Sequence, residues 1–111
     1  MLAFHNDRFI KSEHGRPVRI MSELLASKAL IEDNKIDKTI VIFGSARTDP
    51  ENIYYKAAND LTYKLGKWAK EQPDKYAICT GGGPGIMEAG NKGAKEAGAP
   101  SLGFCIELPF E

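Results

Sequence analysis

The sequence predicts a partial α/β fold: an N-terminal helix followed by strand, helix, strand, helix and strand, in a three-layer, Rossmann-like arrangement. Short apolar runs alternate with longer stretches of helical periodicity, which is typical of a parallel sheet with crossover helices. A turn with one glycine follows the first run and a glycine-rich turn follows the second, at the edge where parallel sheets bind ligands. With 111 residues, 42% hydrophobic and 27% charged, the chain has the size and composition of a single globular domain.

The N-terminal part predicts an arm, a helix and the first strand. Residues 1–16 are polar and irregular, and we expect them to form a loose arm. Pro17 suits the first turn of a helix, and apolar spacing predicts a helix over residues 17–35. Residues 39–43 are continuously apolar and β-branched, which predicts a strand buried on both faces.

Two further helix–strand pairs follow. Apolar residues at steps of three and four predict a helix over residues 54–71. The stripe expected to face the sheet is Tyr54, Ala58, Leu61, Leu65 and Trp68. Strands are predicted at residues 76–80 and 101–106, with a helix over residues 84–98 between them. Its inward face is expected to consist of small residues: Ala89, Gly90, Gly93, Ala94 and Ala97.

Charge and cysteine content narrow the classes of function. Fifteen Lys and Arg balance fifteen Asp and Glu, which argues against a nucleic-acid partner. No apolar run approaches the roughly 18 residues of a membrane span. Cys79 and Cys105 fall in predicted strands without Cys-x-x-Cys spacing, so we expect buried thiols in a reduced, cytoplasmic protein. We expect neither a metal ion nor a cofactor.

The segment from Cys79 to Gly90, CTGGGPGIMEAG, carries the strongest functional signal. It leaves a strand, passes three consecutive glycines and enters a helix. Glycines let the backbone approach an anion, and a helix start directs free N–H groups toward it, so we predict a phosphorylated ligand such as a nucleotide. The dinucleotide fingerprint and the P-loop are excluded, because Gly44 stands alone after the first strand and Gly90 is followed by Asn91-Lys92-Gly93 instead of Lys-Ser/Thr.

Two stretches together resemble the LOG (Lonely Guy) family: residues 42–47, IFGSAR, and residues 80–89, TGGGPGIMEA. The resemblance covers about residues 17–111 and looks like the longer bacterial branch. It implies a nucleotide-binding domain of a phosphoribohydrolase, which cleaves AMP or a cytokinin riboside 5′-monophosphate into base and ribose 5-phosphate. It also implies a homodimer.

One departure from the family pattern affects this prediction. The family's chemistry is associated with a later P-G-G-x-G-T-x-x-E motif and an upstream arginine, and nothing up to Glu111 matches them. The resemblance therefore implies the front, nucleotide-binding half of such a domain, without catalytic residues and inactive alone. The alternatives are a non-catalytic module that binds or senses a nucleotide or phosphorylated ligand, and a purely structural domain.

The residues that the motifs and the resemblance place at the site are Gly44, Ser45, Arg47, Gly81, Gly82, Gly83, Gly85, Met87 and Glu88. The glycines would allow close backbone approach, or serve only a tight turn. Ser45 and Arg47 would contact phosphate, or be a turn residue and a solvated charge. Met87 would pack on the base or fill the core. Glu88 would contact the ribose, or simply complement the helix dipole.

Overall fold

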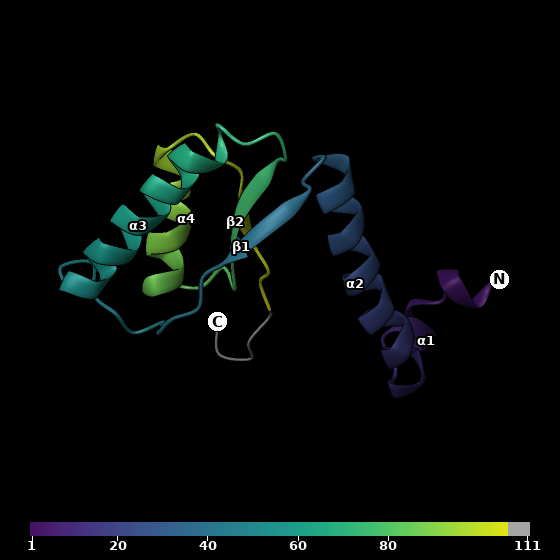
Figure 1. Ribbon diagram of the computed structural model, residues 1–111. Helices are drawn as coiled ribbons and strands as arrows, with labels where there is room; N and C mark the ends of the chain where they lie inside the picture. The colour runs from purple at the N-terminus through teal and green to yellow at the C-terminus, as the bar shows by residue number, and fades with distance from the viewer. Residues whose placement is uncertain (107–111) are drawn as a thin grey trace. The chain divides into compact units, whose positions relative to one another are not determined.

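The structure is a computed structural model, and it describes residues 1–106 (Figure 1). The chain falls into two compact units, the first over Met1–Lys35 and the second from Ile36 onward.

The first unit contains more helix than we expected of its first 16 residues. Its elements are η1 (Ala3–His5), α1 (Asp7–Ile10), η2 (Glu13–Gly15) and α2 (Arg16–Asp33). Arg19 ties the short segments to α2, because its Nη1 donates to the carbonyl oxygens of Ile10 at 2.6 Å and Ser12 at 2.7 Å. Residues 1–16 are therefore short helical turns held by an arginine, where a loose arm was expected.

Helix α2 lies where proline and apolar spacing predict it, with Pro17 in its first turn. None of its residues is buried. Most of its large apolar side chains are exposed: Val18, Ile20, Met21, Leu24, Leu25 and Leu30.

The second unit confirms the predicted α/β order. Its elements are β1 (Lys38–Val41), α3 (Ile53–Ala69), β2 (Tyr76–Thr80), α4 (Ile86–Glu96) and β3 (Ser101–Gly103). The three strands are parallel in the order β1-β2-β3, with Ile40 beside Ile78 and Ile78 beside Ser101. This is a partial Rossmann-like fold, in which both connections are helical crossovers.

Helices α3 and α4 lie side by side on the same side of the sheet (Figure 1). The predicted small-residue face of α4 is buried, with Ala89 and Ala94 fully inaccessible and Gly93 against α3. The predicted face of α3 is wrong by one position. Its buried residues are Tyr55, Thr62, Gly66 and Ala69.

The error on α3 has a physical cause. Periodicity favoured the largest apolar residues, but where α4 approaches closely the inward positions are held by the small Thr62, Gly66 and Ala69. Leu61 and Trp68 remain 51% and 44% exposed, and the Trp68 ring makes an edge contact with Tyr76 at 5.1 Å between centroids. Thr62 and Ala69 take the inward positions that the predicted stripe assigned to these larger neighbours.

Strand β1 is less buried than we expected. Ile40 and Ile42 are half-buried, and Ile42 lies close to Gly90 of α4. The alternate side chains, Val41 and Phe43, are 49% and 90% exposed. The reason is position: β1 is an edge strand of the described sheet. The continuously buried strand is β2 at the centre, where Ala77 to Thr80 are all buried.

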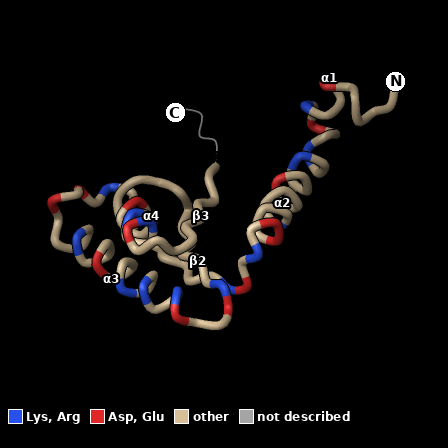
Figure 2. Tube along the Cα trace, turned by 90° about the horizontal axis from the view of Figure 1, so that it is seen from above, with Lys and Arg blue, Asp and Glu red and all other residues tan. Residues whose placement is uncertain are grey.

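Charges of both signs are interspersed along α3 and α4 (Figure 2). The ion pair of Lys64 with Asp60, one helical turn apart at 2.9 Å, is exposed on α3 and typical of a solvated helix face. Within residues 1–106, the helices are all too short or too polar to cross a membrane.

Candidate functional site

The loops after β1 and β2 meet at the carboxyl edge of the sheet. The backbone N–H of Ile86, the first residue of α4, donates to the carbonyl oxygen of Ser45 at 3.0 Å. Gly44 lies directly against the Ile86 side chain, which leaves no room for a Cβ at that position. The two glycine-containing loops that the sequence singled out are therefore in contact.

Two glycines of the second loop are required by its backbone. Gly82 has φ +75° and Gly85 has φ +73°, a region that L side chains rarely adopt. A Cβ on Gly85 would lie 2.8 Å from the carbonyl carbon of Ala46, and one on Gly82 would lie 2.5 Å from the Cys105 sulfur. Turn geometry alone explains glycine at these two positions.

The amide of Gly82 is already occupied. It donates to the Thr80 hydroxyl oxygen at 3.0 Å, so it is not one of the free donors predicted for an anion cradle. No acceptor within residues 1–106 is recorded for the amides of Gly83, Gly85, Met87 and Glu88, which belong to the loop and the first turn of α4. The donors available to an anion are shifted toward the helix start.

A continuous chain of hydrogen bonds connects this loop to β3. The Thr80 hydroxyl, which accepts from Gly82, donates to the Asn91 side-chain oxygen. The Asn91 amide group donates to the Ser101 hydroxyl at 2.7 Å and to the Leu102 carbonyl at 3.0 Å. Thr80 is only 2% exposed, so the chain begins in the core and fixes the loop to two strands and a helix.

Beside the loop is a hollow of about 500 Å³, called here the glycine-loop hollow. It is lined by Gly82, Gly83, Pro84, Glu88, Asn91, Lys92, Lys95 and Ser101. Three of the predicted site residues, Gly82, Gly83 and Glu88, thus share one concave surface with two lysines. The other six do not line it: Gly44, Ser45, Arg47, Gly81, Gly85 and Met87.

The residues outside the hollow have local roles. The Ser45 hydroxyl accepts a hydrogen bond from the Arg47 amide at 3.0 Å and so closes a turn. The Arg47 side chain is exposed. Met87 packs on the glycine loop, since a Cβ on Gly81 would lie 3.0 Å from its sulfur and one on Gly83 would lie 2.6 Å from its terminal methyl.

Glu88 receives a hydrogen bond from across the helix pair. The Tyr55 hydroxyl of α3 donates to Glu88 Oε1 at 2.8 Å, and Tyr55 is only 4% exposed. This hydrogen bond raises the pKa of Tyr55, and burial of the ring acts in the same direction. The hydroxyl therefore stays protonated near neutral pH and keeps donating to the carboxylate.

The two cysteines differ, contrary to the expectation that both are buried. Cys79 is in β2 and 5% exposed, whereas Cys105 lies beyond the end of β3 and is exposed. The difference arises because β3 ends at Gly103, which leaves Cys105 outside the sheet and against Gly82.

We expect the two thiols to react at clearly different rates with a disulfide reagent. Burial raises the pKa of the Cys79 thiol, which lowers its thiolate fraction, and the protein also shields it. At pH 8 one thiol per chain should react quickly, and the second only after denaturation with guanidinium. Equal rates for both thiols in the folded chain would contradict the burial of Cys79.

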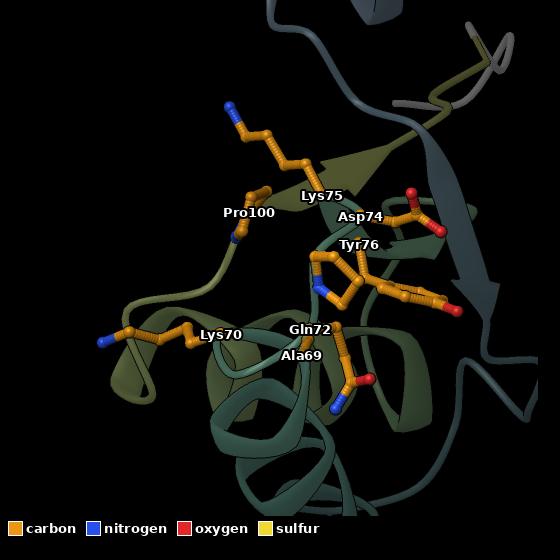
Figure 3. A pocket seen from close by; sticks show the side chains of 8 residues that line it. Ala69, Lys70, Gln72, Asp74, Lys75, Tyr76 and Pro100 are labelled. Carbon is orange, nitrogen blue, oxygen red and sulfur yellow. The ribbon is translucent and has the colours of Figure 1, made fainter.

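A second hollow, of about 320 Å³, lies at the opposite edge of the sheet (Figure 3). It is bordered by the end of α3 and the starts of β2 and β3, including Lys70, Tyr76 and Pro100. Ligands of parallel sheets bind at the carboxyl ends of the strands, and this hollow is at the amino ends. We assign no site to it.

Sequence reasoning missed several residues of the site. Tyr55 escaped because the adjacent Tyr54 fitted the apolar stripe, although Tyr54 is 68% exposed. Asn91 carried a usable signal, since it is a polar residue beside the small-residue face of a helix that follows a glycine loop. Lys92 and Lys95 show their relation to the loop only once the helix start is placed.

Among residues 1–106 no group of three or more His, Cys, Asp or Glu is arranged to hold a metal ion. A search of curated proteins finds no match to the chain. A sequence model of the SLOG cluster4 family matches residues 37–108, which is more than half of the chain and coincides with the α/β unit. On this match the chain belongs to the SLOG cluster4 family.

Proposed function

We propose that this chain binds a nucleoside 5′-monophosphate of the AMP type at the glycine loop, as the nucleotide-binding part of a phosphoribohydrolase. The observation that supports this most is the set of unoccupied amides at the start of α4 beside a hollow lined by two lysines. The family supports it in coarser form, since the SLOG superfamily includes LOG-like proteins and suggests a nucleotide-related fold.

In the proposed binding mode the phosphate takes the amides of Gly83 and Glu88, which are the members of this set that line the hollow. Lys92 and Lys95 contribute positive charge at the wall of the hollow. Glu88 is acceptor-only when ionised, so it suits sugar hydroxyl groups and repels phosphate. The reaction itself would need the carboxylate of the later P-G-G-x-G-T-x-x-E motif and the arginine upstream of that motif, and residues 1–111 contain no match to either.

Calorimetric titration of the chain with AMP tests the proposal, with adenosine as the ligand that lacks phosphate. We expect saturable binding of AMP and much weaker binding of adenosine. Incubation with AMP should release no free adenine, because the hydrolytic groups are absent. Equal affinity for AMP and adenosine would contradict a phosphate site, and adenine release would contradict the assignment of catalysis to the later motif.

Gly83→Ala tests anion binding at this site with the least expected disturbance of the fold. Its φ is not in the left-handed region, and a Cβ there would meet only the flexible end of Met87, so the fold should tolerate it. The added methyl group would displace the end of Met87, which packs on the glycine loop, and so disturb the backbone donors proposed for the anion. We expect AMP affinity to fall about tenfold, the equivalent of one charged hydrogen bond, with little change in the unfolding midpoint.

The non-catalytic alternative predicts the same binding by this chain. A chain extended to include the P-G-G-x-G-T-x-x-E motif distinguishes the two functions, because only a phosphoribohydrolase would then release adenine from AMP. A chain that binds neither AMP nor inorganic phosphate would leave the purely structural alternative.

A further inference from the structure

The Tyr55–Glu88 hydrogen bond joins a nearly buried side chain to an exposed one at the ligand edge of the sheet. Tyr55 comes from the first turn of α3 and Glu88 from the first turn of α4, 33 positions apart in sequence. The Tyr55 side chain is buried, whereas Glu88 is exposed and borders the glycine-loop hollow. A rigid donor therefore acts on a carboxylate that would otherwise rotate freely.

Only one oxygen of the Glu88 carboxylate accepts a hydrogen bond from the described residues. Tyr55 occupies Oε1, and the described residues give no hydrogen bond to Oε2. A carboxylate with one oxygen restrained and the other available is suited to accept from a hydroxyl group of a ligand. The carboxylate is negatively charged and lies beside the free amides of α4. A phosphate group of the ligand would therefore bind at the amides, and hydroxyl groups of the ligand would bind at the carboxylate.

We infer that Tyr55 is a positioning residue: it orients Glu88 so that the carboxylate accepts a hydrogen bond from the ribose hydroxyl groups of a bound nucleotide. This inference rests on the proposed function, because it assumes a nucleotide in the hollow. It adds to that function a discrimination between ribose and sugars that lack the hydroxyl groups. The conformational entropy of the Glu88 side chain is then lost on folding and not on binding, which favours ligand affinity.

The test compares AMP with 2′,3′-dideoxy-AMP on the full chain by calorimetric titration. Wild type should bind AMP more tightly than the dideoxy nucleotide. Tyr55→Phe removes one hydroxyl and keeps the ring that packs between the helices. We expect it to weaken AMP about three- to tenfold, within the range of a single hydrogen bond, and to change the affinity for the dideoxy nucleotide by less than about twofold.

A matched control is Tyr54→Phe, the adjacent tyrosine, which is 68% exposed and has no recorded hydrogen bond from its hydroxyl to residues 1–106. It should leave both affinities unchanged. Glu88→Gln is the second variant, and it should also lower the preference for AMP. Tyr55→Phe added to Glu88→Ala should have no further effect on AMP, because the group it positions is gone.

The outcomes separate the two proposals. If wild type binds both nucleotides equally, or if Tyr55→Phe weakens both by the same factor, the positioning role is wrong while the nucleotide site stands. If wild type binds no AMP, the proposed function and this inference both fail. Loss of AMP preference in Tyr55→Phe and Glu88→Gln, with Tyr54→Phe normal, supports the inference.

Discussion

Replacing Gly93 by alanine is expected to lower the free energy of unfolding by about 3 kcal/mol or more, the upper part of the range for overpacking a tight interface. A Cβ on Gly93 would overlap the Thr62 hydroxyl and the Asn59 carbonyl, and would lie 2.8 Å from the Tyr63 amide nitrogen. These are mainly backbone atoms of α3, which can move only if the helices separate. Equilibrium denaturation with urea measures the change.

Gly90→Ala is the matched control on the same face of α4. Its Cβ would lie 3.3 Å from the Thr80 side chain and 3.6 Å from Ile42, which requires only a small adjustment of side chains. Alanine also has a helix propensity about 1 kcal/mol better than glycine. We expect Gly90→Ala to stay within about 1 kcal/mol of wild type. Equal stability of the two variants would show that α3 and α4 do not approach this closely.

Replacing Gly85 by alanine should have the second large effect, about 3 kcal/mol, because backbone strain and a steric clash combine. At φ +73° and ψ −130° an L residue is strained, and its Cβ would press on the Ser45 carbonyl that accepts the hydrogen bond from Ile86. The contact between the two loops would open. Denaturation measures the stability loss, and AMP titration should show that binding is lost with it.

Gly98→Ala separates strain from clash. Gly98 has φ +76°, but a Cβ there would meet only the flexible amine of Lys70 at 3.2 Å. This variant should cost roughly 1 kcal/mol, the ordinary penalty of a left-handed residue at a helix end, and leave AMP binding unchanged. If Gly85→Ala costs no more than Gly98→Ala, the two loops are not locked together by Gly85.

The order of elements was predictable because strand and helix periodicities differ and each segment shows one of them clearly. The small face of α4 was also predictable, since Ala89, Gly93 and Ala94 recur at helical spacing. The face of α3 was not, because which side a helix buries depends on its neighbour. Thr62 is inward only because it opposes Gly93, and a single segment does not show that pairing.

The candidate site divides in the same way. The glycine loop and its contact with the Ser45 turn follow from the rule that the carboxyl ends of parallel strands lie together. The hydrogen bond by which the Gly82 amide donates to the Thr80 hydroxyl, and so becomes unavailable to a ligand, could not be foreseen, because it depends on the rotamer of the Thr80 side chain. Tyr55 and Glu88 meet through the crossing of two helices, and nothing in either segment alone indicates it.

The chain of hydrogen bonds from Gly82 through Thr80 and Asn91 to Ser101 has a consequence for how the loop meets its ligand. Three consecutive glycines would be highly flexible in isolation, and ordering them on contact would consume much of the binding free energy. Here folding has already ordered them. The loop is preorganised, so we expect a substitution of Ser101, which removes the last link of this chain of hydrogen bonds, to weaken ligand binding at the glycines.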